Sequence, residues 1–338
     1  MPFLWLKMSM KDFLEVENLC FGYLKRPLCL KDVNFSAKKN DRVLILGLED
    51  KGKTSLIKTI SGFDEHFFGN VYLDGEEIRK IPDENKFVSV IFDEPILLNS
   101  TIDKNLNFIY GVLKKEIPSD MEKKELLDVF HLDFDLKLKV KKLSNIQKIK
   151  LCLMRVFIKK PKILFIDNIL KYDFSKDEIE ELKEIISLLI KDCLLFFAAD
   201  NNSFVKYREF FESLKPTKVL YLNNSLVCEK HSIDDLFDNV YDLDVCSFSE
   251  EFEFKDGYCV FQEGVFYLSF DEKIVVKVDK KFNDSFEKLK LSERENEDIV
   301  LVSKKGLNFD LAKNNDINKL FSEKKLMVFS KLDRNRVL

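Results

Sequence analysis

The segment Gly47–Leu56, GLEDKGKTSL, is the feature that most limits what this chain can fold into. It matches the pattern G-x-x-x-x-G-K-[ST], a loop that surrounds the phosphates of a nucleotide. The apolar run RVLILG leads into it, and SLIKTISGF follows with helical spacing. A buried strand, a glycine loop and a helix in this order predict a P-loop domain with an α/β fold.

The residue types of this loop suit phosphate chemistry. Glycine is needed where the backbone turns sharply and comes close to the phosphates. In such a loop the lysine reaches the terminal phosphates and the hydroxyl that follows it coordinates Mg²⁺. The loop residues predicted to bind a nucleotide are Gly47, Lys51, Gly52, Lys53, Thr54 and Ser55.

Apolar strands and helical segments alternate along most of the chain. KFVSVIFDE, KILFID and CLLFFAAD are typical of buried strands, and SKDEIEELKEIISLLI is an amphipathic helix. This alternation predicts an α/β core with a largely parallel sheet. The region from about 100 to 160 has helical periodicity and is expected to form a helical subdomain. Ser144 and Ser175 are predicted helix N-caps.

The pattern changes after about Asp244. YCVFQEGVFYLSF and KIVVKVDK alternate polar and apolar residues with the period of a strand. We therefore predict three parts: an N-terminal extension at 1–12, a nucleotide-binding domain at 13–240, and a small accessory domain, β-rich or mixed, at 241–338.

Composition limits the classes of function. A net charge of −4 gives no reason to expect direct binding of nucleic acid. The sequence has no apolar run long enough for a transmembrane helix, so an integral membrane protein is not expected. Seven cysteines without a C-x-x-C pair are typical of reduced thiols. We expect a cytoplasmic protein, with peripheral attachment to a membrane as an open alternative.

Outside the loop, several motifs follow in a recognisable order. LSNIQ occupies Leu143–Gln147, KILFID ends at Asp167, and DEPILLNSTIDKNL begins at Asp93. With these motifs the chain resembles the nucleotide-binding domain of the ATP-binding cassette (ABC) family, from about Phe13 to Lys230. LSNIQ corresponds to the LSGGQ signature and KILFID to the Walker B strand.

The resemblance implies ATP and Mg²⁺ as cofactors. Tyr23 lies where the family places an aromatic side chain against adenine. Thr54 and Asp167, the latter through a water molecule, would hold the metal. Asp93 occupies the position of the family's glutamine, which senses Mg²⁺ and the γ-phosphate, and is therefore a third candidate near the metal.

Other positions depart from the family pattern. The general-base glutamate after Walker B is Asn168, and the histidine that contacts the γ-phosphate is Ala199. The two signature glycines are Asn145 and Ile146, and Ile146 is expected to put a branched side chain where the backbone should approach ATP. An amide can orient a water molecule but does not accept its proton at neutral pH.

Two further segments differ. Asp50 replaces a glycine of the phosphate loop, and KYDF at Lys171–Phe174 replaces the family's small residue, alanine, leucine and aspartate. Because ABC domains work in pairs, with each ATP between the loop of one and the signature of the other, the departures affect both composite sites.

We therefore predict a degenerate ABC protein that binds Mg-ATP with little or no hydrolysis. It would act as a regulatory or structural subunit with another ABC-type subunit, a membrane protein or an assembly partner. Two alternatives stay open: a scaffold that has lost nucleotide binding, and a slow transporter ATPase that a partner completes.

Overall fold

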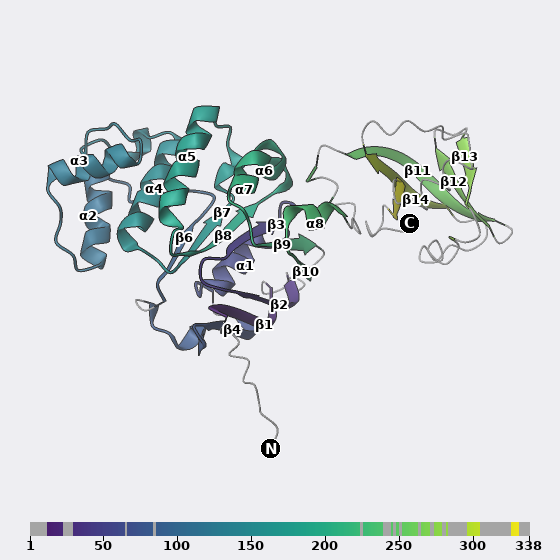
Figure 1. Cartoon of the computed structure of the whole chain (residues 1–338), viewed down its shortest axis with the longest axis horizontal. Helices are drawn as coiled ribbons and strands as arrows, with labels where there is room; N and C mark the ends of the chain where they lie inside the picture. Colours follow the sequence, from purple (N-terminus) through teal and green to yellow (C-terminus); the bar gives the residue numbers. More distant parts are fainter. Residues whose placement is uncertain are drawn as a thin grey trace, which may run out of the picture. The chain divides into compact units, whose positions relative to one another are not determined.

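The structure, a computed structural model, describes residues 12–22, 30–64, 66–83, 86–223, 226–238, 245, 248–249, 252–262, 265–270, 274–278, 282, 296–304 and 326–330. The chain divides into two compact units, Met1–Ile233 and Asp234–Leu338, which are treated separately below (Figure 1). Tyr23 and all of the predicted N-terminal extension except Asp12 lie outside the described residues.

The first unit is built on a six-stranded sheet with the order β10-β9-β3-β8-β7-β6. Its strands are β3 (Arg42–Leu46), β6 (Val88–Ile91), β7 (Ile163–Asp167), β8 (Leu194–Ala199), β9 (Lys218–Asn223) and β10 (Leu226–Lys230). All neighbours are parallel except β9 and β10. Every residue of β7 and β8 is buried, which explains their unbroken apolar sequences. The predicted α/β fold is confirmed.

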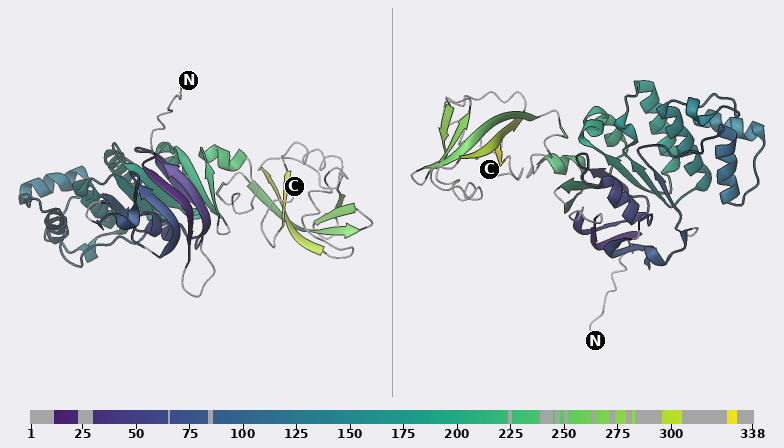
Figure 2. Two further views of the ribbon diagram at one scale, coloured as in Figure 1. Left: turned by 90° about the horizontal axis from the view of Figure 1, so that it is seen from below. Right: turned by 180° about the vertical axis from the view of Figure 1, so that it is seen from behind.

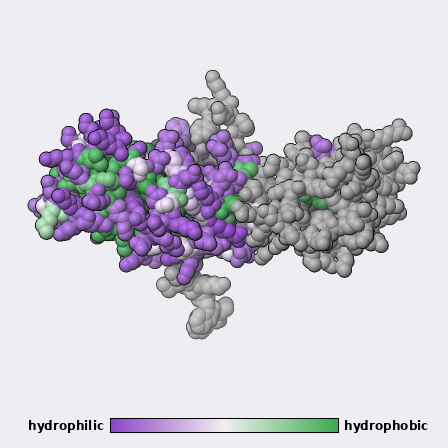
Figure 3. Space-filling view, turned by 90° about the horizontal axis from the view of Figure 1, so that it is seen from above, coloured by the Kyte–Doolittle hydropathy of each residue, from purple (hydrophilic) through white to green (hydrophobic). Residues whose placement is uncertain are grey.

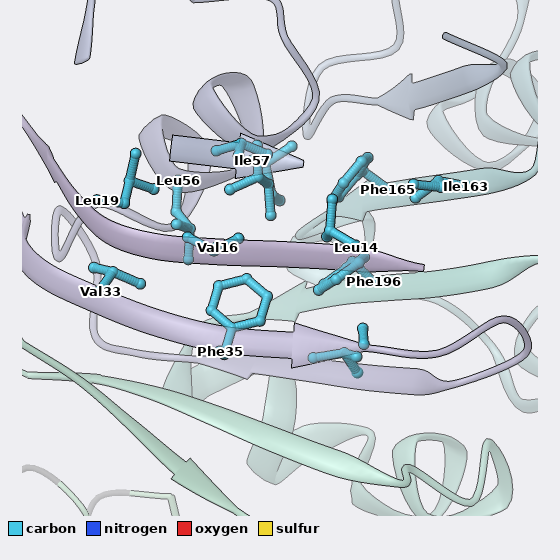
Figure 4. Close-up of a cluster of buried hydrophobic side chains, with 14 of the residues drawn as sticks. Leu14, Val16, Leu19, Val33, Phe35, Leu56, Ile57, Ile163, Phe165 and Phe196 are labelled. Atoms are coloured by element: carbon cyan, nitrogen blue, oxygen red, sulfur yellow. The ribbon is translucent and has the colours of Figure 1, made fainter. Parts of the chain in front are cut away.

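A smaller antiparallel sheet packs on this core. Its order is β2-β1-β4-β5, with strands β1 (Leu14–Phe21), β2 (Leu30–Ala37), β4 (Phe67–Leu73) and β5 (Glu76–Glu77). Side chains of both sheets and of α1 (Lys53–Ile60) form one buried cluster (Figure 4). This cluster fixes α1, and with it the loop that precedes α1, against the ends of the parallel strands.

The two faces of the parallel sheet have different partners. Phe196 of β8 stacks on Phe165 of β7 at 4.8 Å between ring centroids and meets the edge of Phe35 of β2 at 6.2 Å. The next residue, Phe197, packs instead against Phe210 and Phe211 of α7 (Arg208–Ser213). Successive side chains of a strand point to opposite faces, so β8 joins the two halves of the core.

The remaining helices of the first unit begin with side-chain caps. They are α2 (Ile102–Val112), α3 (Asp120–Val129), α4 (Asn145–Lys159), α5 (Lys176–Leu189) and α6 (Asn201–Lys206). Ser144 and Ser175 cap α4 and α5 with full capping boxes, as predicted. The region expected to be a helical subdomain contains α2, α3 and α4.

Short 3₁₀ helices occur at η1 (Ile78–Lys80), η3 (Val140–Lys142) and η4 (Ile169–Lys171). Helix α8 (Ile233–Asp238) spans the boundary between the two units. No helix within the described ranges has both the length and the apolar character needed to cross a membrane.

The described part of the second unit is an antiparallel sheet with the order β13-β12-β11-β14-β15 (Figure 2). Its strands are β11 (Phe252–Gln262), β12 (Val265–Phe270), β13 (Ile274–Lys277), β14 (Asn296–Lys304) and β15 (Leu326–Ser330). The expected domain boundary between residues 240 and 241 lies within this second unit.

We predict that Phe196→Ala lowers the free energy of unfolding by about 3–5 kcal/mol, because it leaves a cavity against Phe165 and Phe35. Urea unfolding followed by circular dichroism measures this. The control is Phe68→Ala, whose side chain is 75% exposed and whose loss is expected to cost less than about 0.5 kcal/mol. Equal losses in the two variants would contradict this description of the core.

Candidate nucleotide-binding site

The two glycines of the phosphate loop are required for different reasons. A Cβ added to Gly47 would lie 3.1 Å from Leu222 Cβ and 3.2 Å from the Leu222 carbonyl oxygen, so β9 leaves little room for a side chain. Gly52 has φ +92°, a left-handed conformation that favours glycine, and α1 begins directly after it. Together they allow the chain to turn from β3 into α1 at the end of the sheet.

Lys53 lies inside this loop and is buried. Its Nζ donates hydrogen bonds to the carbonyl oxygens of Gly47 and Leu48, both at 2.7 Å. Burial lowers the pKa of Lys53, and nearby carboxylates oppose that shift. In order of decreasing effect they are Asp200, Asp167, Glu49 and Asp50. The ammonium group of Lys53 therefore lies in a buried site with several carboxylates nearby.

The start of α1 differs from the starts of α2 to α6. Helices α2 to α6 each have a Thr, Ser or Asp side chain that accepts a hydrogen bond from the first turn. Within the described residues, no side chain caps α1, and its first turn has no acidic residue. The N–H groups of a helix start together with a lysine attract an anion such as phosphate.

Thr54 and Asp167 meet beside the lysine. Thr54 Oγ1 donates a hydrogen bond to Asp167 Oδ2 at 2.6 Å, although the residues are 113 positions apart. Asp167 is the last residue of β7 and is 1% exposed. Burial raises the pKa of Asp167, the Thr54 hydrogen bond opposes this, and the charge of Asp93 adds to it.

A hydroxyl and a carboxylate are ligands that Mg²⁺ accepts, together with waters and substrate phosphates. Among the described residues, no group of three His, Cys, Asp or Glu side chains could hold a metal without such further ligands. The pair formed by Thr54 and Asp167 thus fits a metal that arrives with a nucleotide.

Asp93, the third candidate near the metal, contacts a different residue. Its Oδ2 lies 2.6 Å from Lys171 Nζ, at the end of η4. Burial lowers the pKa of Lys171, but the hydrogen bond and the charge of Asp93 outweigh burial and hold that pKa above its ordinary value. Asp93 and Lys171, which both depart from the ABC pattern, therefore form an ion pair with each other.

Asn168 is also engaged by a neighbour. Its Nδ2 donates to Asp200 Oδ2 at 2.7 Å, and the Asp200 backbone N–H donates to Asn168 Oδ1 at 3.3 Å. Asn168 has φ +46°, a conformation that asparagine tolerates better than most residues. Ala199, next to Asp200, is fully buried and offers no polar group.

Asp200 is the site residue that the sequence reasoning missed. Besides Asn168, it accepts a hydrogen bond from the Ser203 N–H at 2.8 Å and so caps α6. Burial raises the pKa of Asp200, but the hydrogen bonds from Ser203 and Asn168 outweigh burial and hold it below the ordinary value. The sequence could have indicated Asp200, because it lies between a buried strand and the start of a helix.

The signature segment is arranged differently from the expectation. Ser144 caps α4 and exchanges hydrogen bonds with Gln147. Asn145 is exposed, whereas Ile146 is only 5% exposed and packs into the domain. The branched side chain of Ile146, expected where the signature backbone should approach ATP, is buried instead, because the second residue of this capped helix faces the core.

The remaining predicted nucleotide ligands lie in the same loop or outside the described residues. Lys51 precedes Gly52, and Ser55 lies in the first turn of α1, both half-buried. Tyr23 belongs to the segment that the structure does not describe. The structure thus gathers the loop residues and Asp167, and pairs Asp93 with Lys171.

Comparison with known proteins agrees with this geometry. Residues 30–171 match the family model described as ABC transporter. The chain is also similar in structure to a bacterial Atm1-family ABC exporter with ATP bound, with a TM-score of 0.57 and 18% identity, over 67% of this chain and 40% of that one. The first unit has the fold of an ABC nucleotide-binding domain.

Two curated relatives are import ATP-binding proteins by name. The spermidine/putrescine import ATP-binding protein PotA of Haemophilus ducreyi is 27% identical over 186 residues, which are 53% of this chain and 49% of PotA. The Fe(3+) ions import ATP-binding protein FbpC of Pasteurella multocida is 27% identical over 234 residues, 65% of this chain and 66% of FbpC. The matched part therefore spans about half the length of PotA.

We predict that Asp167→Asn stabilises the nucleotide-free protein increasingly as pH rises from about 4 to 7. Because the pKa of Asp167 is raised in the folded wild-type chain, the neutral carboxyl stabilises that chain at low pH, and this stabilisation is lost as pH rises through the folded-state pKa. The Asn side chain stays neutral, so the variant does not lose it. The amide oxygen that replaces the carboxylate in this variant can still accept the Thr54 hydroxyl. Urea unfolding at several pH values measures the difference, and a difference independent of pH would contradict the prediction.

Proposed function

We propose that this chain is an ABC-type subunit that binds Mg-ATP and hydrolyses it slowly or not at all. The observation that carries this proposal is the contrast between two consecutive residues at the end of β7. Asp167 is hydrogen-bonded to Thr54 beside Lys53, so that two candidate metal ligands lie together, whereas Asn168 is hydrogen-bonded to Asp200.

Binding of Mg-ATP is proposed because the site has groups that suit a triphosphate. Lys53 and the N–H groups at the start of α1 would hold the phosphates, and Thr54 and Asp167 would hold Mg²⁺. Bound Mg²⁺ would supply positive charge to the phosphate oxygens. The negative charge of Asp200, Glu49 and Asp50 near Lys53 would weaken the binding of metal-free ATP, because these carboxylates repel its phosphates and partly offset the charge of Lys53.

Slow hydrolysis is proposed because the described part of the site lacks a group that accepts a proton from water. The Asn168 amide donates to Asp200 and accepts from its N–H, so both ends of the side chain are occupied. The amide has no basic lone pair, and the loss of a general base costs about 10²–10⁴ in rate. Ala199 cannot supply the missing imidazole.

Asp200 is a poor substitute for the missing glutamate. It is a carboxylate near Lys53, but one oxygen accepts from Ser203 and the other from Asn168. These hydrogen bonds lower the pKa of Asp200, and a more acidic carboxylic acid is a weaker base. This observation favours slow turnover over the alternative of a complete ATPase.

A surface cleft supports a membrane subunit as the partner. The cleft lies between β6 and α4, has a volume of about 290 Å³ and is lined by Phe63, Phe92, Ile96, Ile109, Cys152 and Arg155. Phe63 and Ile96 are 65% and 67% exposed, and apolar residues gather on the surface of the first unit (Figure 3). Exposed apolar surface of this kind marks an interaction site.

We propose that an apolar segment of a membrane subunit occupies this cleft. The relatives named above are import ATP-binding proteins, which supports a membrane-bound partner over a soluble scaffold. The chain would then lie in the cytoplasm at the membrane surface and pair with another ABC-type subunit.

We predict that saturating Mg-ATP raises the melting temperature of the wild-type chain. A ligand at about 100 times its Kd that binds only the folded state stabilises it by about 2.7 kcal/mol. Lys53→Ala should abolish the shift, because the variant lacks the ammonium group of the loop. Lys183→Ala, which removes a lysine from an ion pair on α5, is the matched control and should keep it. A wild-type chain that Mg-ATP does not stabilise would favour the scaffold alternative.

We predict that Asn168→Glu raises phosphate release by about tenfold or more, because it returns a proton acceptor to the site. Asn168→Gln is the matched control: it has the same length and the same left-handed backbone, but no charge. A malachite-green assay under multiple turnover measures both. Rapid release by the wild-type chain, lost in Lys53→Ala, would overturn the proposal of slow turnover. Equal rates for the two variants would contradict the explanation that a missing proton acceptor at residue 168 slows the reaction.

A further inference from the structure

Asp93 and Lys171 lie at the ends of neighbouring strands. Asp93 follows β6, and Lys171 ends η4, which follows β7. Strands β6 and β7 are parallel neighbours, so the segments that leave them meet at one edge of the sheet. The fold thus joins two residues that are 78 positions apart in the sequence.

Three contacts hold Asp93 in place. Its Oδ2 accepts from Lys171 Nζ at 2.6 Å, its Oδ1 accepts from the Glu94 N–H at 2.9 Å, and its carbonyl oxygen accepts from Tyr172 Oη at 3.4 Å. Both carboxylate oxygens therefore have hydrogen bonds to residues other than Thr54 and Asp167. The Asp93 and Lys171 side chains are 42% and 28% exposed, so solvent can reach the ion pair.

The segment around Lys171 is itself fixed. Tyr207 Oη donates to the Tyr172 carbonyl oxygen at 2.8 Å and accepts from the Phe174 N–H at 2.8 Å. Asp173 forms an ion pair with Lys206 of α6. Because Tyr207, the residue after α6, holds the backbone on the Lys171 side at two points, Lys171 is the anchor and Asp93 is the group that it holds.

Asp93 lies near enough to the metal site to matter there. Ile91 of β6 pairs with Ile166 of β7, so Asp93, two residues after Ile91, and Asp167, directly after Ile166, leave the same end of two neighbouring strands. The charge of Asp93 also raises the pKa of Asp167. If Lys171 did not hold it, the Asp93 carboxylate could offer Mg²⁺ a further oxygen ligand. It would also repel the phosphates of ATP that carries no metal.

We propose that Lys171 is a positioning residue that keeps the Asp93 carboxylate away from the magnesium site, so that Asp167 alone provides the carboxylate for the metal. Lys171 thereby sets how strongly ATP binding depends on Mg²⁺. The inference rests on the proposed function, because it concerns the same Mg-ATP site.

The test compares ATP binding with excess Mg²⁺ and with excess EDTA, by calorimetry on the full chain. In Lys171→Met, the Kd for metal-free ATP should rise about three- to tenfold, as expected for a partly screened charge repulsion, while the Kd for Mg-ATP stays the same or falls. The ratio of the two Kd values should therefore increase. Mn²⁺ binding to the protein without nucleotide, measured by electron paramagnetic resonance, should also become tighter, because a second carboxylate is released.

Three variants separate this role from a general loosening of the loop. Asp93→Asn/Lys171→Met should return both measurements to the wild-type values, because no carboxylate is left to release. Lys171→Arg keeps the charge and should behave as the wild type. Lys206→Met removes the other ion pair of this segment, with Asp173, and should change neither measurement.

The outcomes are distinct. A Kd ratio and Mn²⁺ affinity in Lys171→Met within about twofold of the wild type would overturn the inference, and so would changes that persist in the double variant. If no protein binds ATP, the proposed function fails, and the Mn²⁺ measurement still decides the role of Lys171.

Discussion

The hydrogen bond from Thr54 to Asp167 is the contact on which the nucleotide site depends. It joins the first turn of α1 to the end of β7 across 2.6 Å, between residues that are far apart in the sequence. Strand β8 lies between β3 and β7, so the contact forms only when the three strands are in register. The buried apolar cluster that includes Leu56, Ile57 and Phe165 supplies that register (Figure 4). Formation of the core therefore creates the metal site.

Two polar departures from the ABC pattern have partners in the structure. Asn168 exchanges hydrogen bonds with Asp200, and Asp93 forms an ion pair with Lys171. Each polar group that replaces a catalytic one thus has a neighbour that satisfies it, as buried and half-buried polar groups require. Such an arrangement is consistent with a site that is kept for binding, since the pairs stabilise the empty state without adding a base.

Local features of this fold could be predicted from the sequence. The loop, the buried strands around it, and the caps Ser144 and Ser175 depend on residues that are close together in the chain, so pattern and spacing are sufficient to find them. Other features depend on which strands and faces meet in three dimensions. They are the ion pair of Asp93 with Lys171, the hydrogen bond from Asn168 to Asp200 and the burial of Ile146. A motif alignment gives the position of Ile146 but not the direction of its side chain, which the capped start of α4 determines.

The central proposal is that the chain holds ATP and hydrolyses it slowly or not at all. The direct test is a single-turnover experiment in which the full chain, in excess over ATP and Mg²⁺-saturated, is incubated for about ten minutes, far longer than one turnover of a typical enzyme. The bound nucleotide is then extracted and separated by chromatography. We expect the bound nucleotide to be mainly ATP. Bound nucleotide that is mainly ADP, formed by the wild-type chain and not by Lys53→Ala, would contradict it.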